Sequence, residues 1–187
     1  MSILFLIKLI SFSNLFYFVL NKMSYIASTR FNNVTLNQNM SYRQKTGIPA
    51  IYGPGFQINV KYPIGAILFV FEMNNDENRI EGVSLVINKN VFDKKHKIYE
   101  ESPYNRFIYR SNYWISRENL LQIDPEIIEI FDKILFKGKS HLKRQTGITI
   151  VTEKIFLKWQ YNIEVLKKRI KEIFYKTFNN SELVELV

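Results

Sequence analysis

The sequence predicts an α+β fold in which a small mixed or antiparallel β-barrel, or a strongly bent sheet, carries flanking helices. Residues 66–73 and 83–87 are apolar, and the run Asn-Asn-Asp-Glu-Asn at 74–78 between them is typical of a hairpin turn. Residues 125–137 instead repeat apolar side chains at helical spacing. Because the strand at 66–73 is apolar on both faces, we expect it in the middle of the sheet, with the rest packed around it.

Segments before this hairpin predict one strand, one helix and one loop. Residues 25–31 are typical of a short strand, and residues 35–45 of a helix that ends before Gly47. Residues 47–55 contain two prolines and three glycines, which indicates an irregular loop. Two interpretations of this loop remain open: close backbone packing, or a backbone that approaches a ligand.

Segments after the hairpin predict a second hairpin and more helix. Residues 88–102 form a lysine-rich polar loop, and residues 106–109 and 113–115 predict two strands around a Ser-Asn turn. The clearest helix begins with Asp124 as its N-cap and Pro125 in its first position. A short strand at 146–151 and a helix from 155 onward complete the predicted elements.

Length, charge and the absence of Cys limit the function classes. The 187 residues, 47% of them hydrophobic, fit one domain with a sizeable core. Without Cys, the chain can form no disulfide scaffold, thiolate metal site or Cys nucleophile. The formal net charge of +9 favours a polyanionic partner, namely nucleic acid, an anionic membrane or an acidic protein. A general compositional bias towards Lys explains this charge equally well unless the cations cluster.

Residues 1–22 form a hydrophobic extension ahead of the predicted single domain, which covers residues 23–187. Three interpretations remain open. Residues 1–20 have the length of a membrane anchor, although a Lys at position 8 costs about 2.5–3.5 kcal/mol inside a bilayer. They can also be a signal peptide, although no basic side chain precedes the apolar run. In the third interpretation, translation starts at Met23.

Catalytic, cofactor and metal motifs are not evident, so we predict none of these sites and expect a protein that is not an enzyme. His96 and His141 lack metal-ligand spacing, and the run from Lys137 to Ser140 lacks the upstream Gly of a phosphate-binding Walker loop. Glu72 and Glu81 flank the hairpin turn. Paired carboxylates bind metal ions in nucleases, but solvated strand ends are the simpler and favoured interpretation of these two.

Two clusters predict nucleic-acid contacts. Basic side chains gather in the loop after the predicted helix, where several cations on one surface suit phosphates. Aromatic side chains alternate with Arg in the second predicted hairpin, which suits base stacking combined with phosphate pairing. The alternative is that these aromatics are core residues and the arginines are simply exposed. The predicted contact residues are Tyr104, Arg106, Arg110, Trp114, Lys137, Lys139, His141, Lys143 and Arg144.

Three runs carry a family resemblance: EMNNDENRIEGVSLVIN at 72–88, YNRFIYRSNYWISRENL at 104–120 and ILFKGKSHLKRQTGIT at 134–149. They resemble an uncharacterised protein family of giant and other large nucleocytoplasmic DNA viruses, over about residues 25–156. More loosely, the layout around residues 80–85 resembles PUA-like barrels such as EVE and ASCH domains, which bind RNA or modified bases. The chain departs from many of these domains at Gly65-Ala66, where they carry Gly-Asp.

The resemblance implies a viral protein in the host cytoplasm or the virion. Together with the basic clusters, it predicts a nucleic-acid-binding module. The alternative is a virion or host-interaction protein, held at a membrane by residues 1–20 or facing anionic lipid with its basic C-terminal helix.

Overall fold

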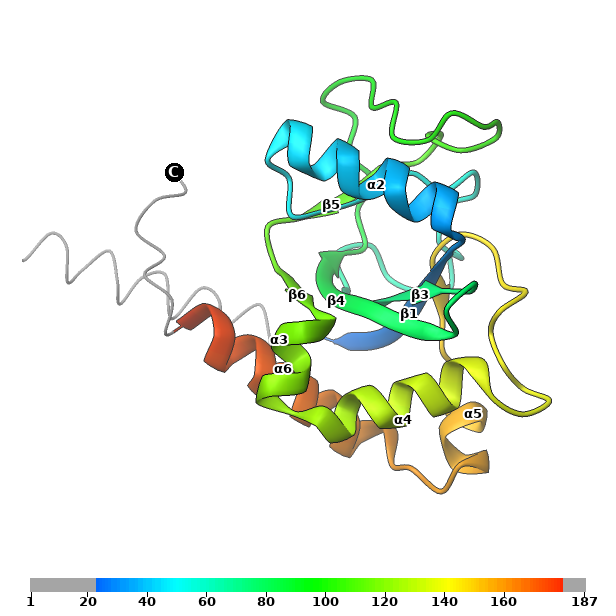
Figure 1. The fold of residues 1–187 in the computed structure, drawn as a ribbon, viewed down its shortest axis with the longest axis vertical. Helices are drawn as coiled ribbons and strands as arrows, with labels where there is room; N and C mark the ends of the chain where they lie inside the picture. The colour runs from blue at the N-terminus through cyan, green and yellow to red at the C-terminus, as the bar shows by residue number, and fades with distance from the viewer. Residues whose placement is uncertain (1–22, 180–187) are drawn as a thin grey trace, which may run out of the picture.

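The computed structural model describes residues 23–179 and contains a five-stranded mixed sheet with helices on both faces (Figure 1). Strand order is β6-β4-β3-β1-β7, with β1 parallel to β3 and the other neighbours antiparallel. A separate antiparallel ladder joins β2 to β5. The strands are β1 (Ser24–Phe31), β2 (Ala50–Tyr52), β3 (Ile67–Asn74), β4 (Arg79–Ile87), β5 (Tyr109–Ser111), β6 (Trp114–Ser116) and β7 (Thr149–Ile150).

This arrangement confirms an α+β fold with flanking helices. Among the described residues, β6 and β7 are the edges of the five-stranded sheet, so the strands do not close into a barrel. The central hairpin forms as predicted, with Ile67 opposite Ile87 and Phe71 opposite Val83. The predicted segments 1–22 and 180–187 lie outside the described residues.

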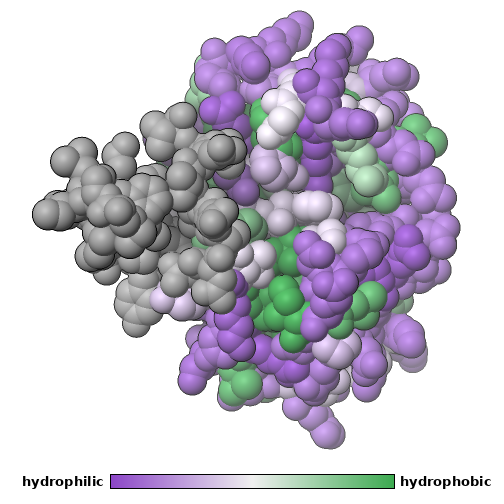
Figure 2. All heavy atoms as spheres, turned by 60° about the vertical axis from the view of Figure 1, so that its left-hand side comes forward, coloured by the Kyte–Doolittle hydropathy of each residue, from purple (hydrophilic) through white to green (hydrophobic). Residues whose placement is uncertain are grey.

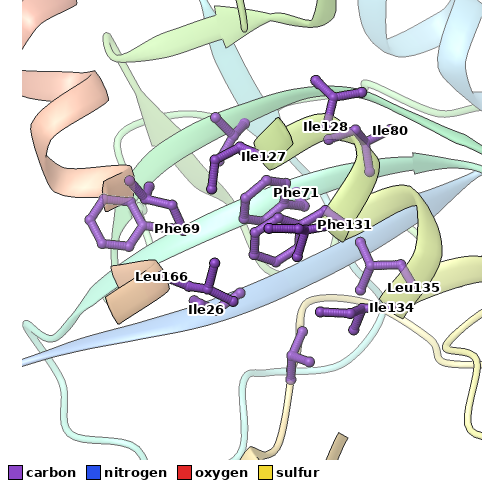
Figure 3. Close-up of a cluster of buried hydrophobic side chains, with 14 of the residues drawn as sticks. Ile26, Phe69, Phe71, Ile80, Ile127, Ile128, Phe131, Ile134, Leu135 and Leu166 are labelled. Atoms are coloured by element: carbon purple, nitrogen blue, oxygen red, sulfur yellow. The ribbon is translucent and has the colours of Figure 1, made fainter. Parts of the chain in front are cut away.

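The two faces of β3 serve two separate cores, which is why this strand is apolar throughout. Phe69 and Phe71 face a core built with the helices on one side of the sheet, whereas Leu68 and Val70 face a second core on the other side. In the first core the Phe71 and Phe131 rings stack with their centroids 3.7 Å apart (Figure 3). The prediction that this strand lies in the middle of the sheet is therefore confirmed.

Five helices of the described part of the chain cover the sheet. In Figure 1, α2 lies above it, while α3, α4, α5 and α6 lie below it. They are α2 (Asn33–Thr46), α3 (Arg117–Ile123), α4 (Pro125–Phe136), α5 (Glu153–Lys158) and α6 (Ile163–Asn179). The predicted cap of α4 is confirmed, because the Asp124 side chain accepts a hydrogen bond from the Ile127 amide. The predicted C-terminal helix is interrupted near Gln160, whose φ is 59°.

The predicted second hairpin is wrong. β5 pairs with β2, whereas β6 pairs with β4 in the other sheet. The chain between them binds the edge of β4 instead of turning back: the Ser111 hydroxyl donates to the Leu85 carbonyl, and the Leu85 amide donates to the Tyr113 carbonyl. The backbone hydrogen bonds that the edge of β4 offers thus outweigh the preference of the short Ser-Asn sequence for a tight turn.

Gly82 permits the close approach of β6 to β4. A Cβ atom at this position would lie 2.6 Å from the Ile115 carbonyl oxygen and 2.8 Å from the Trp114 indole nitrogen. The register of β3 and β4 also shifts beside it, between Glu72 and Met73. A strand glycine commonly marks such a contact or irregularity.

Hydrophilic side chains cover most of the face shown in Figure 2, with a small hydrophobic area in its lower middle. Within residues 23–179, no helix combines the length and apolar character that crossing a bilayer requires. The predicted anchor at 1–20 is not among these residues.

Candidate nucleic-acid interface

A pocket of about 190 Å³ lies where β1 ends and α2 begins. Four separate segments contribute to its wall, so the site is assembled by the tertiary fold. It is lined by Thr29, Arg30, Phe31, Thr35, Tyr52, Gly53, Pro54, Gly55, Phe56, Tyr99, Glu101, Ser102, Pro103, Tyr104, Thr146 and Gly147.

The Gly-Pro-Gly segment at 53–55 lines the pocket and packs closely against residues 103–105. A Cβ atom at Gly55 would lie 2.9 Å from the Pro103 ring, and one at Gly53 would lie 3.0 Å from the Asn105 side-chain oxygen. The Asn105 amide donates to the Gly53 carbonyl at 2.7 Å. This loop therefore both packs closely against its neighbour and lines the pocket.

Tyrosine and phenylalanine rings supply the aromatic part of the wall, and three of them are tyrosines. Tyr104 is 36% exposed, and its ring lies 5.2 Å from the ring of Tyr99, centroid to centroid. Tyr52 and Tyr99 are buried. Among the three tyrosines, Tyr104 is thus the ring that can meet a ligand, and Phe56, which is 62% exposed, is a further exposed ring in the lining.

A buried ion pair between Arg43 of α2 and Glu72 of β3 holds Tyr52 in place. Arg43 is 9% exposed and Glu72 is 1% exposed. The Tyr52 hydroxyl donates to the Glu72 carboxylate at 2.5 Å and also contacts the Ser84 hydroxyl at 2.8 Å. The Trp114 indole donates to the other carboxylate oxygen at 3.1 Å. Nearly every acceptor position of this buried carboxylate is occupied, as its burial requires.

The charges in this cluster stabilise one another. Burial alone lowers the pKa of Arg43, but the Glu72 carboxylate and Tyr52 outweigh it, so the net pKa is raised and the guanidinium stays charged. Burial raises the pKa of Tyr52, and the nearby Glu72 charge raises it further, so its hydroxyl stays protonated. The hydroxyl can therefore act as a permanent hydrogen-bond donor to Glu72.

A second contact fixes the other buried tyrosine. The Asn39 side-chain amide donates to the Tyr99 hydroxyl at 2.9 Å and to the Ile51 carbonyl at 2.7 Å. Burial raises the pKa of Tyr99 above its ordinary value. Successive turns of α2 thus position both rings behind the pocket.

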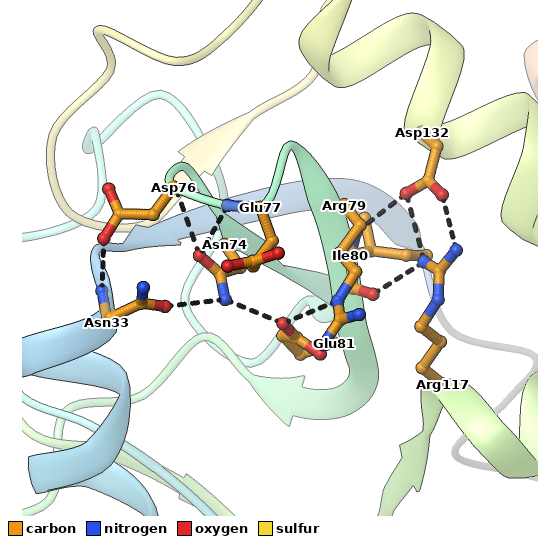
Figure 4. A network of polar contacts seen from close by, with 9 residues as sticks. All are labelled: Asn33, Asn74, Asp76, Glu77, Arg79, Ile80, Glu81, Arg117 and Asp132. Carbon is orange, nitrogen blue, oxygen red and sulfur yellow. Dashed lines mark hydrogen bonds and ion pairs between the residues drawn. The ribbon is translucent and has the colours of Figure 1, made fainter.

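This cluster of Arg43, Tyr52, Glu72 and Trp114 was not predicted from the sequence. Glu72 was considered only as a solvated strand end or a nuclease-type metal ligand, and both interpretations are wrong for it because Arg43, Tyr52 and Trp114 surround it. A carboxylate within an otherwise apolar central strand was the signal, because such a group needs a buried partner. Glu81 instead pairs with Arg79 and accepts from Asn74 (Figure 4). Among the described residues, no His, Asp and Glu side chains gather as a metal site.

Trp114 is less available for stacking than predicted. Its indole holds Glu72, and the Arg43 guanidinium lies 5.3 Å from its ring centroid. Its ring also packs against Gly82. The physical reason is that β6 pairs with β4, which turns this side chain over the sheet. Of the two predicted stacking residues, Tyr104 is the one at the pocket.

The predicted basic loop passes from the hairpin turn to the pocket. The Lys143 ammonium donates to the Asn78 side chain at 2.6 Å, and its carbonyl accepts from Asn75 at 2.9 Å. The turn itself is tied to α2 through Asp76, which accepts from the Asn33 amide (Figure 4). Three residues beyond Arg144, Gly147 lines the pocket.

The other members of this loop differ in exposure. Lys137, Lys139 and Arg144 are exposed, and none forms an ion pair with another described residue. Lys137 is the C-cap of α4. His141 is half-buried and its Nδ1 atom is turned inward, without a hydrogen-bond partner in the described structure.

The aromatic and basic clusters are brought together only in part. Tyr104 lines the pocket, and Arg106 follows two residues later, exposed and with its guanidinium 5.9 Å from the Phe107 ring centroid. Arg110 is elsewhere: it pairs with Asp93 at 2.6 Å, on a strand whose end binds Leu85. Arg79 begins β4 next to the turn that binds Lys143, and Leu85 lies six residues further along this strand. Leu85 is therefore about 20 Å from that turn. Arg106 and Arg144 thus each lie two residues from a lining residue of the pocket, whereas the Arg110 guanidinium is paired with Asp93.

Asp93 holds in place the loop that supplies Tyr99 and residues 101–104 to the pocket lining. Its carboxylate bonds to His96 at 3.2 Å and to Arg110 at 2.6 Å, while the other His96 nitrogen lies 2.8 Å from the Tyr42 hydroxyl of α2. The hydrogen bond to His96, followed by that to Arg110, lowers the pKa of Asp93 from its ordinary 3.8 to about 2.

We expect Asp93→Asn to speed amide hydrogen exchange in residues 88–108 at neutral pH. The side chain that holds His96 and Arg110, which we call the Asp93 tether, loses its charge in this variant. In the unchanged protein, the depressed pKa means that this contribution is complete above about pH 4 and is lost as the pH falls towards 2. Glu100→Gln on the same loop is the matched control. Equal exchange in both variants would contradict the tether.

Comparisons with protein-family models, curated proteins and solved structures found no match to this chain.

Proposed function

We propose that this protein binds single-stranded nucleic acid, with an unpaired base in the pocket and the backbone along the flanking cations. The observation that carries the proposal is the exposed Tyr104 ring in a pocket that the exposed Arg30 also lines, with Arg106 and Arg144 each two residues from a lining residue. Recognition of a single strand combines an aromatic ring, on which a base stacks, with a positive surface that follows the phosphates.

The volume of the pocket favours one small group such as a single base. At about 190 Å³ it is smaller than the roughly 300–1,000 Å³ of pockets for drug-sized ligands. Glu101 lines it and is exposed, and a carboxylate can accept a hydrogen bond from a base amino group. Tyr52 and Tyr99, held from behind, keep the pocket preformed and reduce the ordering cost of binding.

The phosphate contacts in this proposal come from exposed or partly exposed cations on both sides. We assign Arg30, Arg106, Lys139, Lys143 and Arg144 to this role, and leave Arg110 out because Asp93 neutralises it. The resemblance to an uncharacterised family of large DNA viruses, and the looser one to PUA-like domains, whose barrel the open sheet does not form, carry no part of this proposal. They remain predictions, and so does a location in the host cytoplasm or virion.

We expect log affinity for a single-stranded oligonucleotide to fall against log salt with a slope of about −3.5, from five phosphate contacts. Replacing Lys139, Lys143 and Arg144 by Ala should remove most of the affinity and flatten the slope by about 2. The matched control replaces Lys154, Lys158 and Lys168, which are exposed on α5 and α6, and carries the same charge change. A flat salt response, or equal loss in both triple variants, would refute the proposed interface.

Tyr104→Ala tests the pocket separately from the phosphates. Loss of stacking should cost about 1–3 kcal/mol of binding, with the salt slope unchanged because no cation is removed. Phe92→Ala, which truncates an aromatic side chain that is 84% exposed in the same long loop, should bind as before. Fluorescence anisotropy measures the oligonucleotide affinity of both variants. Unchanged affinity in Tyr104→Ala would show that no base binds in this pocket.

A further inference from the structure

The end of the sheet opposite the pocket carries a second surface, independent of the proposed function. It comprises the starts of β1 and β3, the end of β4 and the loop before β3. The Ile67 amide donates to the Met23 carbonyl at 3.0 Å, and the Gly65 amide donates to the Asn88 carbonyl at 2.9 Å. The Asn88 side chain donates to the Tyr62 and Pro63 carbonyls, each at 3.0 Å. These bonds hold the segments together as one end of the molecule.

Large apolar side chains project from this end. Val60 is 91% exposed, Ile64 82%, Met23 63% and Ile87 44%. Single exposed apolar residues are ordinary on a protein surface, but several at one place mark an interaction site. They project from a loop and from strand ends, and the neighbouring pocket at 57–62 is lined mainly by polar groups.

Lysines and tyrosines surround these apolar tips. The Lys61 ammonium lies 5.0 Å from the Tyr62 ring centroid, and the Tyr62 ring lies 5.0 Å from the Tyr25 ring. Lys167 of α6 reaches the Tyr25 ring at 5.9 Å and also pairs with Glu164 at 2.7 Å. Lys89 follows Asn88 and is exposed. Projecting apolar tips with a basic and tyrosine-rich surround match the interface of a lipid bilayer.

We propose that this surface, which we call the lysine-tyrosine end (Met23, Tyr25, Val60, Lys61, Tyr62, Ile64, Ile87 and Lys89), docks onto an anionic lipid membrane. Val60 and Ile64 enter the acyl boundary, while Lys61 and Lys89 bind lipid phosphates. A bilayer fits better than a protein partner because separate projecting side chains suit a fluid surface. The apolar run at 1–20 also joins the described chain at Met23, on this same end.

Full-length protein should sediment with vesicles of phosphatidylcholine and phosphatidylserine, and much less with phosphatidylcholine alone. We expect Lys61→Gln with Lys89→Gln to weaken this binding about 25-fold, from about fivefold for each lysine near an anionic surface. Val60→Asp with Ile64→Asp should weaken it at least about tenfold. Val34→Asp, which changes a 60% exposed Val on α2, is the matched control. Equal binding by all variants would overturn the proposal.

A site-specific readout separates this surface from residues 1–22. Ile64→Trp should shift its emission to shorter wavelength on anionic vesicles and be quenched by brominated lipid, whereas Val34→Trp should show neither effect. Quenching at both positions, or at neither, would overturn the proposal. The proposal would also be overturned if the Val60 and Ile64 variant lost oligonucleotide binding but kept vesicle binding. The surface would then contact nucleic acid and not lipid.

Discussion

Arg43→Ala should destabilise the protein by about 3–5 kcal/mol, because it leaves the Glu72 carboxylate buried without its cation. That loss is a large part of the roughly 5–15 kcal/mol by which domains are stable. Urea unfolding followed by circular dichroism measures it as a lower transition midpoint. We expect the pocket to suffer as well, since the same carboxylate holds the Tyr52 hydroxyl.

Two further variants test whether this loss comes from the pairing itself. Arg79→Ala removes an Arg of the exposed pair with Glu81 and should cost about 0–1 kcal/mol. Replacing both Arg43 and Glu72 by Met removes both charges together, and should cost less than the two single changes summed. A midpoint for Arg43→Ala that matches Arg79→Ala would show that the buried pair does not form.

Phe131→Ala should cost about 3–5 kcal/mol, because it opens a cavity in the larger core. The Phe131 ring is fully buried, stacks on Phe71 of β3 and meets the Phe156 ring edge-on at 6.2 Å. It therefore joins α4, α5 and the central strand. The same urea titration measures the effect.

Leu121→Ala is the control for this variant. Leu121 is 43% exposed on α3, so its truncation should change the unfolding free energy by about 0.5 kcal/mol or less. A loss below about 1.5 kcal/mol for Phe131→Ala would mean that the stacked pair is not the centre of the core.

Local patterns were sufficient for part of the fold. The central hairpin was predictable because apolar runs and a five-residue polar turn lie next to each other in the chain. α4 was predictable from its own cap, Asp124, and from its apolar stripe. In each case the determining groups are a few residues apart, so the sequence displays them directly.

The candidate site was predictable only in fragments. Tyr104 and the basic loop were predicted as contact residues, but the pocket that Tyr104 lines was not predicted. Arg110 was counted among the predicted phosphate contacts because its pairing with Asp93 could not be foreseen. The two residues are 17 positions apart, and no periodic pattern in the sequence links them. Trp114 was assigned to stacking because aromatic alternation does not show which neighbour its strand will pair with.

The sequence by itself determined an apolar hairpin at the centre, helices around it and a strongly basic surface. The tertiary structure alone decided that β5 and β6 enter different sheets, that Arg43 neutralises Glu72 from 29 residues away, and that four segments enclose one pocket. The physical reason is that a buried charge, or a backbone group at a sheet edge, needs a matching partner. That partner comes from a distant segment of the folded chain. Nothing within a short window of sequence encodes that choice.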